Sequence, residues 1–185
     1  MFYSRALRAV GMAGILLVAA APAPAAASTT QDVAFAQAAH QNNLAEVAAG
    51  KVAFRKSKDP VVKELAATFM RDHIRMDAEL ARTARKLEIH LPATPSDEQQ
   101  ALVRRYEAAG ADTFDEYYIS TQLVAHREAH ELAATQAEKG ADPALRNLAE
   151  KATGVIDGHR DLLRAAAVSE GMAGYVEASG RAPRD

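Results

Sequence analysis

The chain has 185 residues, with 24 acidic against 22 basic side chains, no cysteine and no tryptophan. This balance offers neither the basic stripe of a nucleic-acid-binding domain nor a polybasic membrane patch. Without cysteines the fold has no disulfides, so packing alone must hold it together, which favours long helices rich in alanine.

Residues 1–27 are predicted to be a cleavable signal peptide and not part of the fold. Arg5 and Arg8 precede an apolar stretch (VGMAGILLVAAA), two prolines end it, and the small residues at 25–27 offer a cleavage site before Ser28. An uncleaved anchor is the alternative, because the apolar stretch nearly reaches the length that spans a bilayer. Cleavage would change the formal charge from −2 to −4 and leave an exported, periplasmic protein without a transmembrane segment.

The first two predicted helices form a hairpin. Thr29 and Thr30 can cap a helix that runs to about Lys56, with apolar residues at helical spacing. Asp59-Pro60 then provides an N-cap followed by proline at the first helical position, which starts a second helix to about Leu87. The short connection between them predicts antiparallel neighbours.

A long connection, residues 89–112, follows the first hairpin. It opens with the helix breakers Pro92 and Pro95 and contains a short helix that Ser96 starts, with Gln99 completing a capping box. We expect this segment to cross from one end of the bundle to the other, as the long connection of ferritin-like bundles does.

The last two predicted helices form a second hairpin. Thr113 and Glu116 have the spacing of a capping box and start a helix that Gly140 ends. Asp142-Pro143 opens a fourth long helix, to about Val168, and its sequence ADPALRNLA resembles KDPVVKELA at the start of the second.

The predicted organisation is a signal peptide at 1–27, a domain at 28–168 and a flexible C-terminal tail at 169–185. The domain is predicted to be all-α, a ferritin-like four-helix bundle of two helical hairpins joined by a long crossover that carries a short helix. An envelope protein partner or a homo-oligomer remains open.

Each predicted long helix carries one polar residue on an apolar face near its middle: Glu46, His73, His126 and His159. Glu46 and His73 lie 13 and 14 residues from the aspartate of the first Asp-Pro turn, and His126 and His159 lie 16 and 17 residues from that of the second. At ~1.5 Å rise per residue each pair sits roughly 20 to 25 Å from its turn. We therefore expect the four side chains to meet inside the bundle.

Three readings of this layer remain open. The sequence favours a buried hydrogen-bond network in a non-catalytic protein, because ionisable groups inside a core are usually paired. Three imidazoles and a carboxylate would also suit one divalent transition metal, and a small oxidoreductase on a modified ferritin-like scaffold is the third reading. Four residues are candidates for an outer shell around a metal: Asp77, Tyr118, Gln122 and His130.

The remaining candidates are assigned to the surface or to the edge of this layer. His40 and His90 are predicted to be surface residues. Asp72, Asp115 and Asp157 are predicted to flank the layer, to belong to an outer shell around it, or to be solvated charges. No nucleophile elbow, phosphate loop or CxxC motif is present in the sequence to indicate other chemistry.

Four sequence segments together resemble a family of exported bacterial proteins known as domain of unknown function 4142 (DUF4142). They are NLAEVAAGKVA at 43–53, MRDH at 70–73, FDEYYISTQLVAH at 114–126 and IDGH at 156–159. The resemblance covers about 32–163. It implies an envelope location and a ferritin-like four-helix bundle, members are often labelled outer-membrane proteins, and it implies no activity or ligand.

The wider comparison with ferritin-like di-iron proteins argues against iron oxidation. Those proteins place a glutamate on two helices and Glu-x-x-His on the other two. Glu46 takes the place of one glutamate, and two of the histidines match the motif histidines, but the other glutamate positions hold His126, Met70 and Ile156. Too few carboxylates remain to bridge two irons, so ferroxidase chemistry is not expected.

Overall fold

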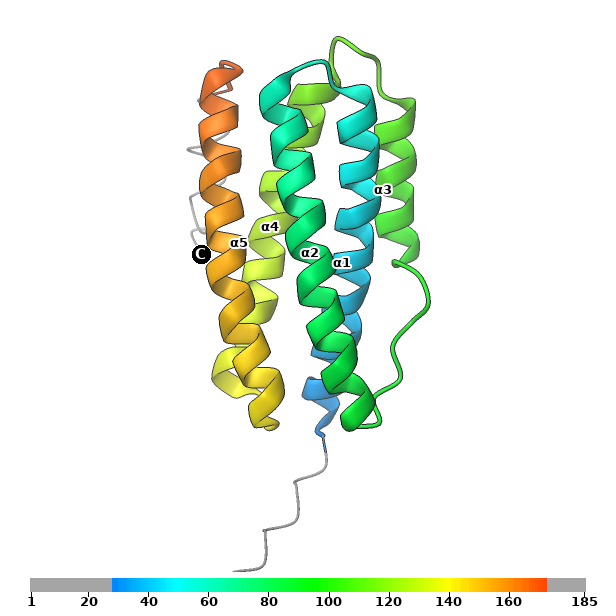
Figure 1. The fold of residues 1–185 in the computed structure, drawn as a ribbon, viewed down its shortest axis with the longest axis vertical. Helices are drawn as coiled ribbons and strands as arrows, with labels where there is room; N and C mark the ends of the chain where they lie inside the picture. The colour runs from blue at the N-terminus through cyan, green and yellow to red at the C-terminus, as the bar shows by residue number, and fades with distance from the viewer. Residues whose placement is uncertain (1–27, 173–185) are drawn as a thin grey trace, which may run out of the picture.

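A computed structural model describes residues 28–172, which form four long helices and one short one. These are α1 (Thr30–Lys56), α2 (Pro60–Lys86), α3 (Asp97–Ala108), α4 (Phe114–Lys139) and α5 (Pro143–Ser169). The long helices run side by side as a bundle, and α3 lies alongside α1 (Figure 1). The predicted all-α four-helix bundle is confirmed. The predicted signal peptide and the tail beyond 172 lie outside the described residues.

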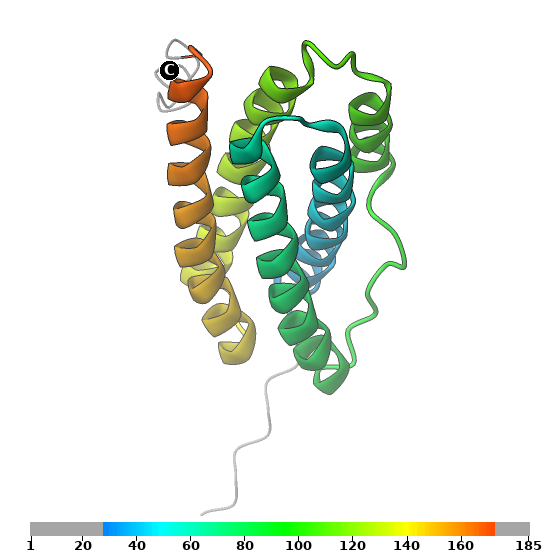
Figure 2. The same cartoon turned by 45° about the horizontal axis from the view of Figure 1, so that its top comes forward.

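The long crossover sets the direction of the helices. The α1–α2 hairpin turns at one end of the bundle and the α4–α5 hairpin at the other, so α2 and α4 run in the same direction (Figures 1 and 2). The segment between α2 and α4 returns along the length of the bundle, with Pro92 and Pro95 in its irregular part and α3 in the rest. The predicted crossover is confirmed.

All five predicted helix starts are confirmed, and four of them have the predicted side-chain cap. The carboxylates of Asp59 and Asp142 each accept hydrogen bonds from two backbone amides of the first turn, as N-caps do. Thr29 and Ser96 form capping boxes, with Asp32 in α1 as the reciprocal partner of Thr29.

The capping box predicted at Thr113 is wrong. Thr113 has helical backbone angles (φ −116°, ψ −3°) and its side chain makes no capping bond. The chain enters α4 from a turn, and the hydroxyl of Thr113 donates to the carbonyl of Gly110 at 3.5 Å. The local spacing of Thr113 and Glu116 cannot reveal this, because the preceding turn decides where the hydroxyl points.

The apolar core is divided into two clusters along the bundle axis. One cluster includes Phe69, Ile119 and Leu163, and the other includes Leu80 and Ile156. The polar residues predicted to meet in mid-bundle lie between the two clusters in sequence on every long helix. A polar layer therefore separates two apolar halves.

Helices α1 and α2 approach closely at Gly50. A side-chain carbon at Gly50 would lie 2.5 Å from Cγ of Met70 and 3.1 Å from the carbonyl oxygen of Ala66. Glycine is therefore required for the packing of this helix pair, because any side chain would push Met70 aside and crowd backbone.

Asp32 fixes the start of α1 to the α4–α5 turn, a contact that the sequence analysis missed. Its buried carboxylate accepts hydrogen bonds from the amide and hydroxyl of Thr29, the side-chain amide of Gln136, and the backbone amides of Ala141 and Asp142, at 2.7–3.3 Å. Burial raises the pKa of Asp32, but these hydrogen bonds outweigh it and lower the pKa to about 2. Asp32 is thus a buried, ionised and well-bonded anchor.

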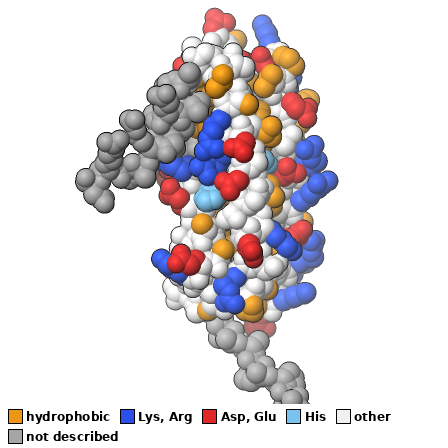
Figure 3. Space-filling view, turned by 90° about the vertical axis from the view of Figure 1, so that its left-hand side faces the viewer, with side chains coloured by type: hydrophobic (Ala, Val, Ile, Leu, Met, Phe, Trp, Pro, Cys, Tyr) orange, Lys and Arg blue, Asp and Glu red, His pale blue; other side chains and the backbone are white. Residues whose placement is uncertain are grey.

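The surface mixes charges of both signs. On the described part of the face in Figure 3, Lys and Arg side chains are interspersed with Asp and Glu. Within residues 28–172, no helix combines the length and the apolar character needed to cross a membrane.

Candidate functional site

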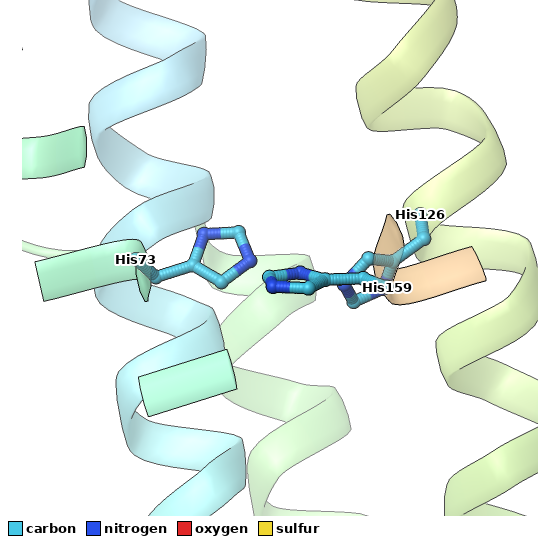
Figure 4. A group of neighbouring side chains, drawn as sticks. All are labelled: His73, His126 and His159. Atoms are coloured by element: carbon cyan, nitrogen blue, oxygen red, sulfur yellow. The ribbon is translucent and has the colours of Figure 1, made fainter. Parts of the chain in front are cut away.

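Three histidines from three helices converge in the middle of the bundle. His73 comes from α2, His126 from α4 and His159 from α5, and their rings point toward one another (Figure 4). One ring nitrogen from each lies within 4.8 Å of the other two, and each residue is at most 2% exposed. Phe69 covers the group one turn along α2, with its ring centroid 4.8 Å from His126 and 4.4 Å from His159. His73, His126 and His159 form what we call the histidine triad.

The outer nitrogen of His73 is held by a chain of polar side chains. Its Nδ1 lies 2.9 Å from Oδ1 of Asn43. The amide nitrogen of Asn43 donates a long hydrogen bond of 3.5 Å to Asp77, whose carboxylate also lies 2.6 Å from Nδ1 of His40. Because Asp77 only accepts, the amide oxygen of Asn43 faces His73 and receives the proton of its Nδ1. The inner Nε2 of His73 is left with a lone pair and has no partner in the part of the chain that the structure describes.

His126 and His159 are oriented in the same way. Nδ1 of His126 donates to the backbone carbonyl of Gln122, 3.0 Å away, which leaves a lone pair on Nε2. Nε2 of His159 lies 3.2 Å from a carboxylate oxygen of Asp72, so it carries the proton and Nδ1 keeps a lone pair. The two inner nitrogens, His126 Nε2 and His159 Nδ1, face each other at 3.3 Å. With the protons on the outer nitrogens, neither inner nitrogen has a proton to donate to the other.

Burial keeps the triad neutral. Desolvation is the largest cause of a lowered pKa in all three rings, and it lowers the pKa of His126 to about 3. The neighbouring histidines lower the pKa of His73 further, whereas Asp72 partly opposes the shift in His159. At neutral pH the rings are therefore uncharged and can act as ligands.

Glu46 is buried but belongs to a neighbouring polar cluster. Its side chain, 5% exposed, interacts with Gln122, and its charge acts on Tyr106 and Tyr118. Its carboxylate does not join the three ring nitrogens that could hold a metal ion. Burial raises the pKa of Glu46 to about 7, opposed only by the hydrogen bond with Gln122.

Several polar atoms of this cluster are buried without a hydrogen-bond partner among residues 28–172. They are Oε2 of Glu46, the hydroxyl of Tyr118 and Oε1 of Gln122. The hydroxyl of Tyr106 is bonded to Thr121 at 2.6 Å and to Gln122 at 3.4 Å. The backbone of Gln122 thus positions a triad histidine, while its side chain belongs to the Glu46 cluster.

The other candidates lie farther out. His130 is half-buried and lies 3.5 Å from Asp157, away from the triad's ring nitrogens. His90 is exposed as expected. The prediction that His40 is a surface residue is wrong, because the packing of α1 on α2 brings it against Asp77 and buries most of it.

Asn43 is the site residue that the sequence analysis did not single out. It lies three residues before Glu46 on the inward face of α1, and this spacing was its only signal. Asp72, for which the sequence left a flanking, an outer-shell or a solvated position open, directly contacts His159, because its carboxylate reaches across from α2 to α5.

Comparison with known proteins identifies the family of this chain. No curated protein and no solved structure matches the chain. The family profile described as "Domain of unknown function (DUF4142)" matches residues 17–166. This range includes the triad and all four long helices, apart from the end of α5. The chain therefore belongs to the DUF4142 family.

Proposed function

We propose that this protein binds one divalent transition-metal ion at His73, His126 and His159, and does so in the periplasm after removal of residues 1–27. The observation that carries the proposal is that each outer ring nitrogen lies within hydrogen-bond distance of an oxygen that can accept its proton. Each inner nitrogen then holds a lone pair in a buried space. Three converging lone pairs repel one another unless a cation lies between them.

The distances support a tetrahedral site. Zinc–nitrogen bonds of about 2.0–2.1 Å place two ligand nitrogens about 3.3 Å apart. The inner nitrogens of His126 and His159 already lie 3.3 Å apart. The ligand nitrogens lie within 4.8 Å of one another, so the nitrogen of His73 has to approach the other two by about 1.5 Å at most to complete the set.

The ligand set also indicates the class of metal. Imidazole suits zinc, copper, iron and nickel, and three histidines leave a fourth position for water or a small ligand. The acceptors on the outer nitrogens are those that commonly orient metal-binding histidines: a carboxylate (Asp72), a backbone carbonyl (Gln122) and an amide oxygen (Asn43). The proposal assigns binding and no turnover.

A purely structural histidine layer is the competing reading. In that case one inner nitrogen must carry a proton. A cationic ring would supply it, but the lowered pKa values oppose that charge at neutral pH. A changed tautomer would also supply it, but would break the hydrogen bond of that ring to Gln122, Asn43 or Asp72. Metal binding is therefore the better account.

Metal stoichiometry tests the proposal. Protein stripped with a chelator and dialysed against Zn²⁺ or Co²⁺ should retain one ion per chain by elemental analysis. Replacement of His73, His126 or His159 by Ala should abolish retention. The exposed His90 gives the matched control, and His90→Ala should retain the ion. Wild-type protein without stoichiometric metal, or equal loss in His90→Ala, would refute the site.

The export part has a separate test. The intact mass of protein from the periplasmic fraction should correspond to a chain that begins at Ser28, or within a residue or two of it. A stable product in the membrane fraction that retains Met1 would contradict cleavage and leave the metal site untouched.

A further inference from the structure

A cavity of about 310 Å³ lies between all four long helices, next to the triad. Most of its inner wall is apolar and comes from Phe35, Leu80, Leu132 and Ile156. Asn43 and His73 form a polar end, so the cavity shares one wall with the triad. The space therefore combines an apolar body with a small polar end, the usual composition of a small-molecule site.

The exposed residues at the mouth of the cavity balance in charge. Arg75 and Glu79 come from α2, and Lys151 comes from α5. Asp72, which also lines the cavity, is 24% exposed and lies 3.9 Å from Arg75. Two cations and two anions give no net attraction for a charged ligand, and an ionised group would lose its hydration inside the apolar part.

The size of the cavity limits the ligand further. An engineered apolar cavity of about 150 Å³ binds benzene, and this cavity has roughly twice that volume. An occupant of two fused rings, or a short carbon skeleton of similar volume, would fill it. One hydroxyl at the polar end could accept a hydrogen bond from the second amide hydrogen of Asn43.

We infer that this cavity binds a small, uncharged, mainly apolar molecule of about two-ring size with one hydrogen-bonding group. This site is separate from the proposed metal site. Binding there does not require a metal ion, because protein side chains alone form the cavity wall. His73 belongs to both, so the bound molecule lies beside the triad.

Binding of 2-naphthol, measured by calorimetry on the mature protein, tests the inference. We expect one molecule per chain in both chelator-treated and zinc-loaded protein. Ala152 lies half-buried in the cavity wall, so Ala152→Phe should fill the space and weaken binding about tenfold or more. Ala39→Phe fills it from α1 and serves if the first variant is unstable. The control is Ala78→Phe on the exposed side of α2, which should change binding less than about twofold.

The outcomes separate the inferences. Absence of saturable binding up to about 1 mM, or equal binding by the folded wall variants and the control, overturns the cavity site. Tighter binding of 2-naphthoate than of 2-naphthol overturns the assignment to an uncharged ligand. Binding to metal-free protein that takes up no metal would leave the cavity site standing while the metal site fails.

Discussion

Two buried polar regions of this bundle are bonded in opposite ways. At the base of the bundle, the Asp32 carboxylate receives five donors and is ionised. In the middle, the triad has three acceptors that face one another without a donor between them. A buried polar group that is fully bonded stabilises the fold, whereas a group left with converging lone pairs is available for a ligand.

The largest expected effect comes from removing Asp32. Asp32→Ala should lower the free energy of unfolding by about 3–5 kcal/mol, because two backbone amides and the Gln136 side chain lose their acceptor inside the protein. Urea denaturation at pH 7 measures it. Asp161→Ala, at an exposed ion pair, is the control and should stay within about 0.5 kcal/mol. Equal small losses in both variants would show that Asp32 is no anchor.

Replacement of Glu46 should stabilise the protein at pH 8, in contrast to replacement of Asp32. Its pKa is raised to about 7 from 4.5, so the unfolded chain ionises it first, and stability is lost as the pH rises from 4.5 to 7. Glu46→Gln should therefore raise the free energy of unfolding at pH 8 by up to about 3 kcal/mol relative to the wild type. At pH 4.5 the difference should vanish. A variant less stable than the wild type at pH 8 would contradict the interpretation.

The triad should make the protein less stable as the pH falls, the reverse of the pH dependence that Glu46 causes. Burial lowers the pKa of His126 to about 3, so below pH 6.5 the unfolded chain takes up a proton that the folded chain does not. Stability should fall by about 1.4 kcal/mol per pH unit for this residue, or roughly 2 kcal/mol between pH 6.5 and 5. Measurement in the Glu46→Gln background, without metal, removes the opposing titration. If the free energy of unfolding of this variant did not change between pH 6.5 and 5, the folded triad would already hold protons.

The smallest effect should come from replacing a triad histidine in metal-free protein. His159→Leu removes a lone pair that faces His126, and the free energy of unfolding in chelator should change by less than about 1 kcal/mol. Zinc should stabilise the wild type by about 2.7 kcal/mol at 100 times its Kd and leave the variant unchanged. A loss above about 3 kcal/mol in chelator would indicate a hydrogen-bonded layer instead.

The fold could be predicted because its signals are local. Each Asp-Pro pair places a cap and a proline in the positions that start a helix, and the distance between the two pairs reveals the crossover. The convergence of the three histidines followed from their matched distances to these turns. Glu46 was expected among them, but its side chain turns toward Gln122 and two tyrosines.

The details of the site could not be predicted, because they depend on contacts between distant residues. Asn43 reaches His73 across 30 positions, and Asp72 reaches His159 across 87. The carboxylate of Asp32 bonds to a side chain 104 residues away, so its burial has no signal in the neighbouring sequence. Helical periodicity gives the face of a helix on which a residue lies, but side-chain rotamers decide which partner it meets.

The division of the triad between the two hairpins affects how fast a bound ion could leave. His126 and His159 belong to the α4–α5 hairpin and His73 to the α1–α2 hairpin, and all three residues are buried. Each hairpin consists of contacts between residues near in sequence, which form early, whereas docking of the hairpins brings together distant segments. An ion that left through the cavity at His73 would exchange quickly, whereas an ion held behind the rings would exchange only when the hairpins separate, the slow opening that amide hydrogen exchange reports. The rate of ion exchange would therefore show which of the two routes the bundle uses.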